Sequence, residues 1–294
     1  MLGRRTLLAA TLLLALAPPA LAKAGRLRVD FIDVGQGDAA LITSPAGKTV
    51  LIDGGPHEAS APLVSFLRER HAGPIDLVLL THWHADHLGG LRAVVETIGV
   101  RQFLDAPTPH AGKEREHLLA ALERARVPIR EATPGRTIDL GAGATLTLLG
   151  PPEPPIEGSR SDVNANSVVA RLDFGETSFL FMGDAETPTE RWLLARKANV
   201  RARVLKVAHH GSRFSSTARF LDAVHPAIAV ISVGAGNDYH HPAPGTLRRL
   251  EDRGVEVHRT DLEGTVTIES DGRALTMGPA GRRALATTQE ISRP

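Results

Sequence analysis

The sequence predicts a single layered α/β domain that follows a short export leader. Segments of β-branched and apolar residues alternate with segments whose apolar residues recur every three or four positions, and the alternation continues along the chain. Strands and helices mixed in this way are typical of a layered α/β architecture. With 294 residues, 42% of them hydrophobic, the chain can bury one large core, and one such domain would use all of it.

The first 22 residues have the features of a signal peptide. Two adjacent arginines come first, the apolar run Leu7 to Leu16 follows, and Ala20-Leu21-Ala22 is a small-x-small cleavage site. The run is shorter than the roughly 20 residues that span a bilayer, so we expect cleavage rather than an uncleaved anchor. The paired arginines also allow twin-arginine export. We therefore expect a periplasmic or secreted protein with no integral membrane part after processing.

Composition limits the chemistry of any site. The chain contains no cysteine, so a metal would have to bind to histidine and carboxylate side chains. Without the two leader arginines, 32 basic residues face 33 acidic ones, a net charge of −1. No overall basic field is present to attract nucleic acid, and the 13 histidines are informative only where they cluster.

The expected elements follow one another in a mature domain of residues 23–278. Strands bounded by glycine, proline or aspartate are expected at Leu27 to Val34, Ala39 to Thr43, Thr49 to Ile52, Ile75 to Leu80, Ala144 to Leu149, Val168 to Phe174, Ser178 to Met182, Val204 to Val207, Ala227 to Val233, Val255 to His258, Thr265 to Ser270 and Ala274 to Met277. Helices are expected at Ala59 to Arg70, Leu88 to Ile98, Lys113 to Arg126, Glu186 to Lys197, Thr217 to Val224 and Pro244 to Arg253.

Two segments show no periodicity. The stretch Pro151 to Asn166 is rich in proline, glycine, serine and asparagine, which predicts a loop. A structureless loop of that length in a folded domain is often a functional rim or lid. Residues 279–294 are expected to form a flexible tail.

The strongest functional signal is Thr81-His82-Trp83-His84-Ala85-Asp86-His87, which directly follows a predicted buried strand. Three histidines and an aspartate within six residues at a strand end can converge on a small volume. Borderline metals such as zinc favour imidazole and carboxylate ligands. The alternative is a polar turn in which Asp86 only caps the next helix, and four ligand-type side chains at this spacing argue against it.

This motif resembles the His-x-His-x-Asp-His signature of the metallo-β-lactamase superfamily, and more narrowly the soluble hydrolase domain of the ComEC competence proteins and its stand-alone relatives. The matching stretches, in order, are Phe31 to Asp38, Leu51 to Gly55, Asn164 to Ser167, Phe181 to Glu186, Leu205 to Ser212 and Asn237 to Pro242. The resemblance implies a four-layer αββα sandwich that binds two divalent metal ions, with zinc as the first expectation and manganese as the alternative.

The resemblance also implies residue roles. His82 and His84 would hold the first metal, Asp86 and His87 the second, and Asp184 would bridge both. A shared carboxylate holds two cations roughly 3.5–4 Å apart and offsets part of their repulsion. Without the resemblance, Asp184 would be read as a turn residue or helix cap.

His209 and His210 follow a predicted strand, where neighbouring side chains face opposite ways, so we expect only one of them to bind metal. From the resemblance, His210 is assigned to the second metal and His209 to the substrate or to a contact behind the ligands. His241 would contact an anion or act as general acid for the leaving group, or be a solvated loop histidine. Asp53 is expected to orient a ligand histidine through a hydrogen bond.

One departure concerns the first metal. Many members of the superfamily place a further histidine near the position of Asn164 to Ser167, where this chain has none. Asn166, with Ser167 beside it, or a water would then complete the first site. This departure leaves the choice between zinc and a harder ion such as manganese open.

The function expected is hydrolysis by a metal-activated water, with Asp86, His209 and His241 as the catalytic candidates. A phosphodiester is the favoured substrate, either a small one or single-stranded DNA, although 4% aromatic residues argue against an extended stacking platform. Hydrolysis of a carboxylic ester, lactone or lactam is the alternative. A third hypothesis is that the chain is a weakly catalytic, metal-binding accessory protein.

Overall fold

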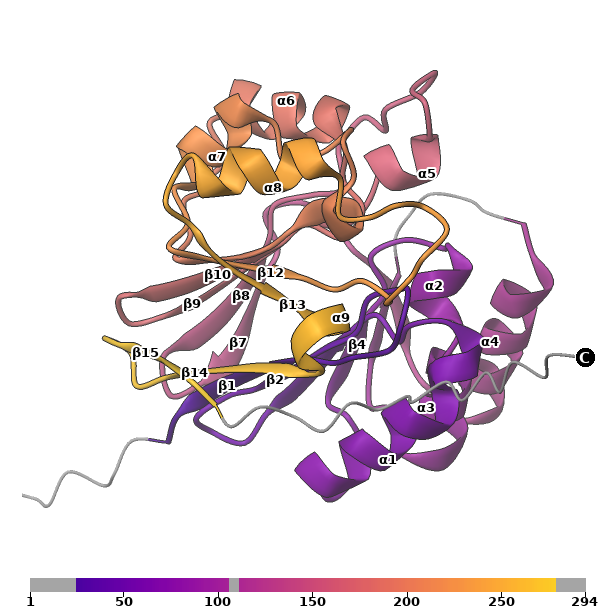
Figure 1. The fold of residues 1–294 in the computed structure, drawn as a ribbon. Coiled ribbons are helices and arrows are strands. Elements are labelled where there is room, and N and C mark those ends of the chain that lie inside the picture. Colours follow the sequence, from indigo (N-terminus) through magenta and orange to yellow (C-terminus); the bar gives the residue numbers. More distant parts are fainter. Residues whose placement is uncertain (1–24, 106–110, 279–294) are drawn as a thin grey trace, which may run out of the picture.

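In the computed structural model, which describes residues 25–105 and 111–278, two β-sheets stack face to face between two layers of helices (Figure 1). The four-layer αββα sandwich expected for this chain is therefore confirmed. The predicted leader, residues 1–22, and the predicted tail, residues 279–294, lie outside the described residues. Within the described ranges, no helix is long and apolar enough to cross a membrane.

The first sheet has eight strands in the order β15-β14-β1-β2-β3-β4-β5-β6. Their bounds are β1 Leu27–Phe31, β2 Ala40–Thr43, β3 Thr49–Ile52, β4 Leu77–Leu79, β5 Phe103–Asp105, β6 Ile129–Glu131, β14 Val266–Ser270 and β15 Leu275–Met277. Neighbours from β3 to β6 pair in parallel, and the other pairs are antiparallel. The carboxyl ends of β3 and β4 therefore lie side by side at one edge of the sandwich.

The second sheet has seven strands in the order β13-β12-β11-β10-β9-β8-β7. Their bounds are β7 Thr137–Gly141, β8 Ala144–Leu148, β9 Ala170–Phe174, β10 Thr177–Phe181, β11 Val204–Lys206, β12 Ile228–Ile231 and β13 Glu256–Arg259. Neighbours from β10 to β13 pair in parallel, so the carboxyl ends of β10, β11 and β12 also lie together.

Helices cover the outer face of each sheet. The helices are α1 Ser60–Arg70, α2 Ala85–Leu88, α3 Leu91–Thr97, α4 Lys113–Arg124, α5 Asp162–Ala165, α6 Thr187–Ala195, α7 Ala218–Val224, α8 Pro244–Glu251 and α9 Thr260–Glu263, with short 3-10 turns η1 His57–Ala59 and η2 Ala208–Gly211. Helices α1, α3 and α4 pack on the first sheet, and α6, α7 and α8 pack on the second (Figure 1).

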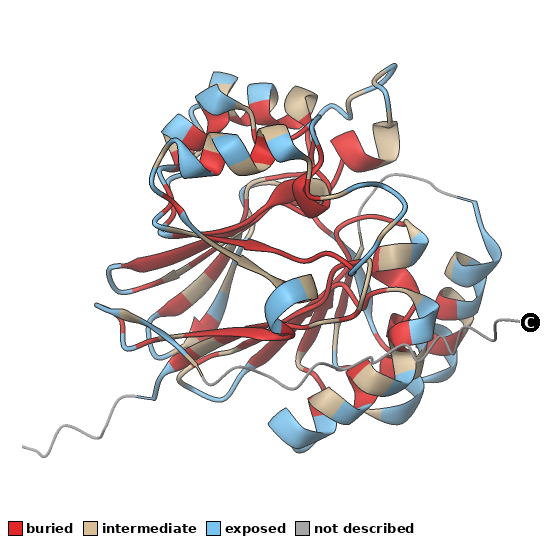
Figure 2. Ribbon diagram, viewed as in Figure 1, coloured by how far each residue is buried: buried red, intermediate tan, exposed pale blue. Residues whose placement is uncertain are grey.

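The apolar core has three layers, one between the sheets and one under each helix layer. Between the sheets, the rings of Phe31 on β1 and Phe181 on β10 stack with their centroids 5.9 Å apart. Both side chains are almost fully buried, and buried residues follow the inner strands of both sheets (Figure 2). This contact joins β1 of the first sheet to β10 of the second.

Several expected boundaries differ from the structure for local reasons. The strand expected to reach Val34 ends at Phe31, because the Asp33 carboxylate accepts a hydrogen bond from the Gly35 amide and closes a turn. The helix expected at Leu88 to Ile98 begins only at Leu91, as α3, because Gly89-Gly90 separates it from the short helix α2, which ends at Leu88. The loop predicted from Pro151 to Asn166 contains one helical turn, α5, whose start is capped by the Ser161 side chain.

Five elements were not anticipated, namely β5, β6, β7, α5 and α9. Each is three to five residues long, which is too short for apolar periodicity to show. The three residues of β6 are also all exposed, so they carry no alternation of buried and exposed positions. These short elements extend the sheets and helix layers without changing the architecture.

Replacing Phe181 by alanine is expected to destabilise the fold by about 3–5 kcal/mol, since it leaves a cavity between the sheets. The free energy of unfolding from urea titration would measure this loss. The matched control is Leu262→Ala, because Leu262 is 60% exposed and its removal should change stability by no more than about 0.5 kcal/mol. Equal effects of the two substitutions would contradict the packing described here.

Candidate metal centre

The polar residues singled out from the sequence meet where strands of both sheets end. Asp53 directly follows β3, and His82 follows β4 after the two intervening residues Leu80 and Thr81. From the second sheet, Asp184 follows β10 and the His209-His210 pair follows β11. Since parallel neighbours end at the same edge, the loops after them bring these side chains together between the sheets.

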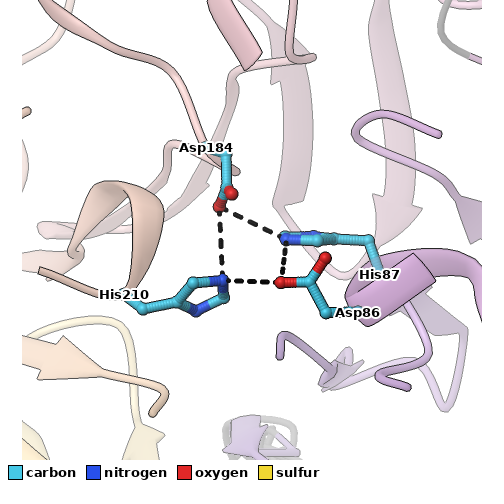
Figure 3. A group of neighbouring side chains, drawn as sticks. All are labelled: Asp86, His87, Asp184 and His210. Carbon is cyan, nitrogen blue, oxygen red and sulfur yellow. Dashed lines mark hydrogen bonds and ion pairs between the residues drawn. The ribbon is translucent and has the colours of Figure 1, made fainter. Parts of the chain in front are cut away.

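Four of these side chains form one compact group, which we name the second group: Asp86, His87, Asp184 and His210. Each offers a ligand atom within 4.8 Å of the others (Figure 3). Asp184 Oδ1 lies 3.3 Å from His87 Nε2 and 3.7 Å from His210 Nε2. Asp86 Oδ2 lies 3.1 Å from His210 Nε2, so two imidazoles and two carboxylates point at one centre.

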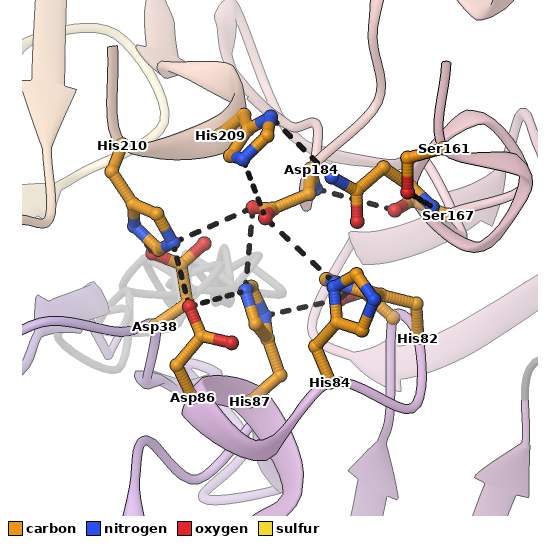
Figure 4. A network of polar contacts seen from close by, with 12 residues as sticks. Asp38, His82, His84, Asp86, His87, Ser161, Ser167, Asp184, His209 and His210 are labelled. Carbon is orange, nitrogen blue, oxygen red and sulfur yellow. Dashed lines mark hydrogen bonds and ion pairs between the residues drawn. The ribbon is translucent and has the colours of Figure 1, made fainter. Parts of the chain in front are cut away.

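The first group contains His82, His84 and Asp184, again with ligand atoms within 4.8 Å of one another. His82 Nε2 lies 3.1 Å from His84 Nδ1 and 3.8 Å from Asp184 Oδ2. The two oxygens of Asp184 therefore face different groups, Oδ1 the second and Oδ2 the first (Figure 4). This is the arrangement required of a carboxylate that bridges two cations.

The donors fit a pair of divalent cations. His87 Nε2 and Asp184 Oδ1 are both buried, and neither has a hydrogen-bond partner among the described residues. Buried polar atoms are rarely left unpaired, and a cation between them would satisfy both. Imidazole and carboxylate donors suit zinc and related first-row ions. The most accessible member of the second group is Asp86, whose side chain is 32% exposed, so it marks the open side of the site.

A layer of hydrogen bonds orients the candidate ligands. His87 Nδ1 donates to Asp53 Oδ2 at 2.8 Å, which leaves Nε2 free to face Asp184. The same Asp53 carboxylate accepts from the backbone amide and the hydroxyl of Thr81, both at 2.7 Å. The expectation that Asp53 orients a ligand histidine matches this geometry.

His210 is oriented by a second set of contacts. Its Nδ1 donates to the Ser232 carbonyl at 3.0 Å and lies 3.2 Å from Asp38 Oδ1. Asp38 in turn accepts a 2.7 Å hydrogen bond from the buried Lys206 ammonium. Although burial works against ionisation, Lys206 and His210 lower the pKa of Asp38 to about 2. The buried charges thus compensate one another beneath the second group.

Tight backbone geometry positions Asp184 and the histidine pair. Gly183 has φ of +50°, and a Cβ at this position would lie 2.9 Å from the Thr81 side chain, so the turn that presents Asp184 requires glycine. His209 and His210 do not continue a strand as expected, because β11 ends at Lys206 and both residues adopt left-handed conformations, with φ of 50° and 52°. The two side chains are therefore not oriented by strand alternation, as the sequence had suggested.

In that turn, His209 faces the other oxygen of the shared carboxylate. Its Nε2 lies 3.6 Å from Asp184 Oδ2, and its Nδ1 lies 3.1 Å from Glu186 Oε1 and 3.5 Å from Asn164 Nδ2. Glu186 also pairs with the guanidinium of Arg160. His209 is thus aimed at the centre by two neighbours, and its ring lies on the side of the first group.

Asn166 does not reach the first group. Its Oδ1 accepts from the Ile156 amide, and its Nδ2 donates to the carbonyls of Ile156 and Asp162, so the side chain holds the loop before α5. The expectation that Asn166 completes the site is corrected: Asn164, two residues earlier, lies beside His209 with a buried Oδ1 that has no hydrogen-bond partner in the described part. The Ser167 hydroxyl accepts from the Asp184 amide at 3.3 Å and so supports the bridging residue.

His241 lies at the edge of the site. Its ring centroid is 5.5 Å from that of His209 and 6.4 Å from that of His210. Burial, together with these two histidines, lowers the pKa of His241 to about 4, which argues against its service as a general acid at neutral pH. The contact with an anion that the sequence suggested is compatible with this position.

Sequence reasoning missed several contributors: Asp38, Thr81, Asn164, Glu186 and Lys206 as supports, and Arg160 at the rim. All but Arg160 lie inside the motif stretches already quoted, so their place beside predicted ligands was the available signal. Arg160 had no such signal, because its partner Glu186 lies 26 residues away.

The charges of the second group depend strongly on one another. Against the effect of burial, Asp184, Asp53 and Asp86 raise the pKa of His87 well above its usual range. For His210, likewise against burial, Asp184 and Asp38 raise the pKa to about 10. Without metal, both imidazoles are therefore protonated on both nitrogens at neutral pH. Their positive charge then offsets the carboxylates, as bound cations would.

Metal binding at pH 7 is accordingly expected to release about two protons, from His87 and His210. Because the pKa of His210 is about 10, His210 should contribute no released proton once the pH has been raised above that value. Calorimetric titration with zinc in buffers of different ionisation enthalpy measures the number of protons released. The exposed His225 offers the control His225→Gln, which should leave that number unchanged; binding without proton release would contradict the assignment.

Replacing Asp53 by asparagine is expected to weaken zinc binding about 10- to 100-fold, since it removes the charge behind His87. Asp53 has φ of 60°, a conformation that asparagine tolerates, so backbone strain is not added. Competition with a chromogenic chelator would measure the affinity. Asp222→Asn, at a side chain 65% exposed on α7, is the matched control, and an equal loss there would refute the role of Asp53.

Sequence and structure comparisons agree with this geometry. Residues 32–235 match the model of the family described as "Metallo-beta-lactamase superfamily". The chain is 29% identical over 262 residues to ComE operon protein 3 of Bacillus subtilis strain 168, covering 83% of this chain and 33% of that protein. It is 30% identical over 236 residues to competence protein ComA of Neisseria gonorrhoeae, covering 80% of this chain and 31% of that one. The chain thus spans about a third of the length of these relatives.

Solved structures show the same fold. The metallo-β-lactamase fold protein YhfI from Bacillus subtilis superimposes with a TM-score of 0.55 at 14% identity, over 84% of this chain and all of that one. Identity that low supports the architecture alone, whereas the family match covers most of the chain and includes the histidine motif, Asp184 and the His209-His210 pair. The expected resemblance to ComEC-type competence proteins is also confirmed. The chain belongs to the metallo-β-lactamase superfamily, whose fold implies divalent metal ions and metal-dependent hydrolysis.

Proposed function

We propose that this chain is an exported, metal-dependent phosphodiesterase or nuclease of the ComEC hydrolase-domain type. The observation that carries the proposal is the sharing of Asp184 between two groups of candidate ligands, each with its donor atoms within 4.8 Å of one another. Two metals held by one carboxylate suit the in-line displacement at phosphorus. Zinc is the expected ion, with manganese as the alternative.

When bound, two divalent ions would supply a water that is deprotonated near neutral pH and would offset the charge that develops in the reaction. His82, His84 and Asp184 would hold one ion, and Asp86, His87, Asp184 and His210 the other. Asp53 keeps the His87 proton on Nδ1, so that Nε2 is available. Asp86, on the open side, is placed to orient the attacking water and the incoming substrate.

Positive and polar groups at the opening favour a phosphodiester. His209, which is held by Glu186, and His241 beside it lie next to the shared carboxylate, and Arg160 reaches the same place through its pair with Glu186. Donors of this kind recognise the nonbridging oxygens of a phosphate. Carboxylic ester, lactone or lactam hydrolysis remains the second reading for the same metal pair.

The metal-binding accessory protein is favoured by one observation, the composition of the first group. It has three side chains where the second has four, and Asn164, which lies beside His209, offers an amide rather than an imidazole. A first ion held by fewer ligands would bind less tightly, and a singly occupied site would hydrolyse phosphodiesters poorly. The metal content of the mature protein therefore distinguishes the phosphodiesterase hypothesis from the accessory-protein hypothesis.

Turnover of bis(p-nitrophenyl) phosphate should fall at least 100-fold in Asp184→Asn, because that substitution removes the negative charge shared by both groups. Metal content should fall from about two ions per chain to about one or fewer. Metal analysis and initial rates on the same preparations would measure both quantities. Asp139→Asn, at an exposed position on β7, is the control. Full activity in Asp184→Asn would refute the proposal, and metal binding without any turnover would favour the accessory protein.

A further inference from the structure

Two phenyl-type side chains are exposed in the part of the chain that the structure describes, and each is linked through intermediate residues to His209 at the candidate metal centre. Tyr239 is 68% exposed and Phe214 is 39% exposed, whereas the other large exposed hydrophobic side chains there are aliphatic. Exposed aromatic rings beside a site frequently bind ligands, since burial would otherwise be the favoured state. The contacts of these two rings therefore indicate which kind of substrate the site could bind.

Tyr239 extends a row of rings outward from the shared carboxylate. His209 Nε2 lies 3.6 Å from Asp184 Oδ2, and the His209 and His241 ring centroids are 5.5 Å apart. The Tyr239 ring stacks on His241, with centroids 5.9 Å apart and planes inclined by 26°. Tyr239 is thus the outermost ring of the row, and most of its surface faces solvent.

Phe214 is linked to His209 by a second series of contacts, which begins with two arginines around its ring. The Arg160 guanidinium lies 4.0 Å from the Phe214 ring centroid, and that of Arg213 lies 5.2 Å from it. Arg160 also pairs with Glu186, which contacts His209 Nδ1 at 3.1 Å. Stacking and ion pairing fix the plane of Arg160, while half of its side chain remains exposed. Arg160 is therefore held next to the residues that contact His209, and Arg213 lies over the same phenyl ring.

We propose that these residues form a rim clamp for single-stranded nucleic acid, in which Tyr239 stacks a base and Arg160 and Arg213 hold a backbone phosphate. The inference rests on the proposed phosphodiesterase function and names the residues outside the metal centre that would hold a strand in that site. A single strand alternates flat bases with phosphates. The clamp offers a ring that reaches His209 through His241 and a cation that reaches His209 through Glu186. A scissile phosphodiester at the metal centre would lie between them.

This assignment agrees with the charge of the chain as a whole. The net charge is +1 over the full sequence, so no general basic field attracts nucleic acid, and binding must depend on a few placed groups. A lipid surface is a poorer fit, because the two exposed rings are separated by charged and imidazole groups rather than joined in one apolar patch. A short contact of about one base and one phosphate also suits a chain with few aromatic residues.

Binding of a fluorescein-labelled, phosphorothioate-linked oligothymidylate to the metal-loaded mature protein tests the clamp, with fluorescence anisotropy as the readout. Tyr239→Ala should raise the Kd about tenfold, whereas Tyr239→Phe should remain within about twofold of the parent, because the ring alone stacks. Arg213→Ala should raise the Kd and reduce the slope of log Kd against log salt by about 0.7, the loss of one phosphate contact.

Arg101→Ala is the matched control for charge. Arg101 lies just before β5, at the end of the first sheet opposite the metal centre, and 64% of its side chain is exposed. Its removal should leave the Kd and the salt slope unchanged. An equal loss in Arg101→Ala and Arg213→Ala would mean that only net charge matters and would overturn the clamp.

Other outcomes separate this inference from the function on which it rests. Unchanged binding in Tyr239→Ala, with turnover of bis(p-nitrophenyl) phosphate intact in the parent, overturns the clamp and leaves the phosphodiesterase. Binding that depends on Tyr239 and Arg213, without any turnover, supports the clamp and removes the phosphodiesterase. If the protein binds phosphatidylglycerol vesicles through Tyr239 and Arg213 and binds no oligothymidylate, the clamp is overturned in favour of a lipid surface.

Discussion

The buried carboxylate of Asp184 is the group on which the rest of the site depends. Its side chain is 2% exposed, and such burial would disfavour its charge, but His87, His210 and His209 surround it and hold its pKa well below the usual range. Neither the carboxylate nor the imidazoles would be stable in this interior alone, because an unpaired buried charge is costly. Metal cations between the carboxylates and the imidazoles would replace the histidine protons as the compensating positive charge. The interior is therefore compatible with either protons or metal ions.

Backbone geometry brings these groups together. Strands of both sheets end at one edge, and the chain leaves three of them through left-handed residues: Asp53 after β3, Gly183 after β10 and the histidine pair after β11. Left-handed residues turn the backbone within one or two positions, so side chains that follow different strands can face the same centre. The packed core beneath, centred on Phe31 and Phe181, gives the turns a rigid base.

The sequence predicted a layered architecture and the histidine motif because both leave local patterns, whereas the roles of Asp184 and His210 were implied only by the resemblance to the metallo-β-lactamase superfamily. Alternation of strands and helices predicted the layered fold, and the spacing of His82, His84, Asp86 and His87 predicted a metal motif. Contacts between distant residues left no such pattern. The choice between Asn164 and Asn166 depends on which face of one helical turn meets His209, and the pairing of Arg160 with Glu186 joins a loop to a helix start. The short strands at the sheet edges were missed for a different reason, since three exposed residues show no periodicity.

The candidate ligands are contributed by both sheets, and this distribution has a consequence for the order of events in biosynthesis. Asp86 and His87 precede Asp184 by about a hundred positions, and His210 follows Asp86 by 124 residues. A ribosome therefore releases the histidine motif long before its partners exist. The complete second group can assemble only after the chain has been made through residue 210 and the second sheet has docked on the first. Cofactor acquisition is consequently a late step in the life of the nascent chain.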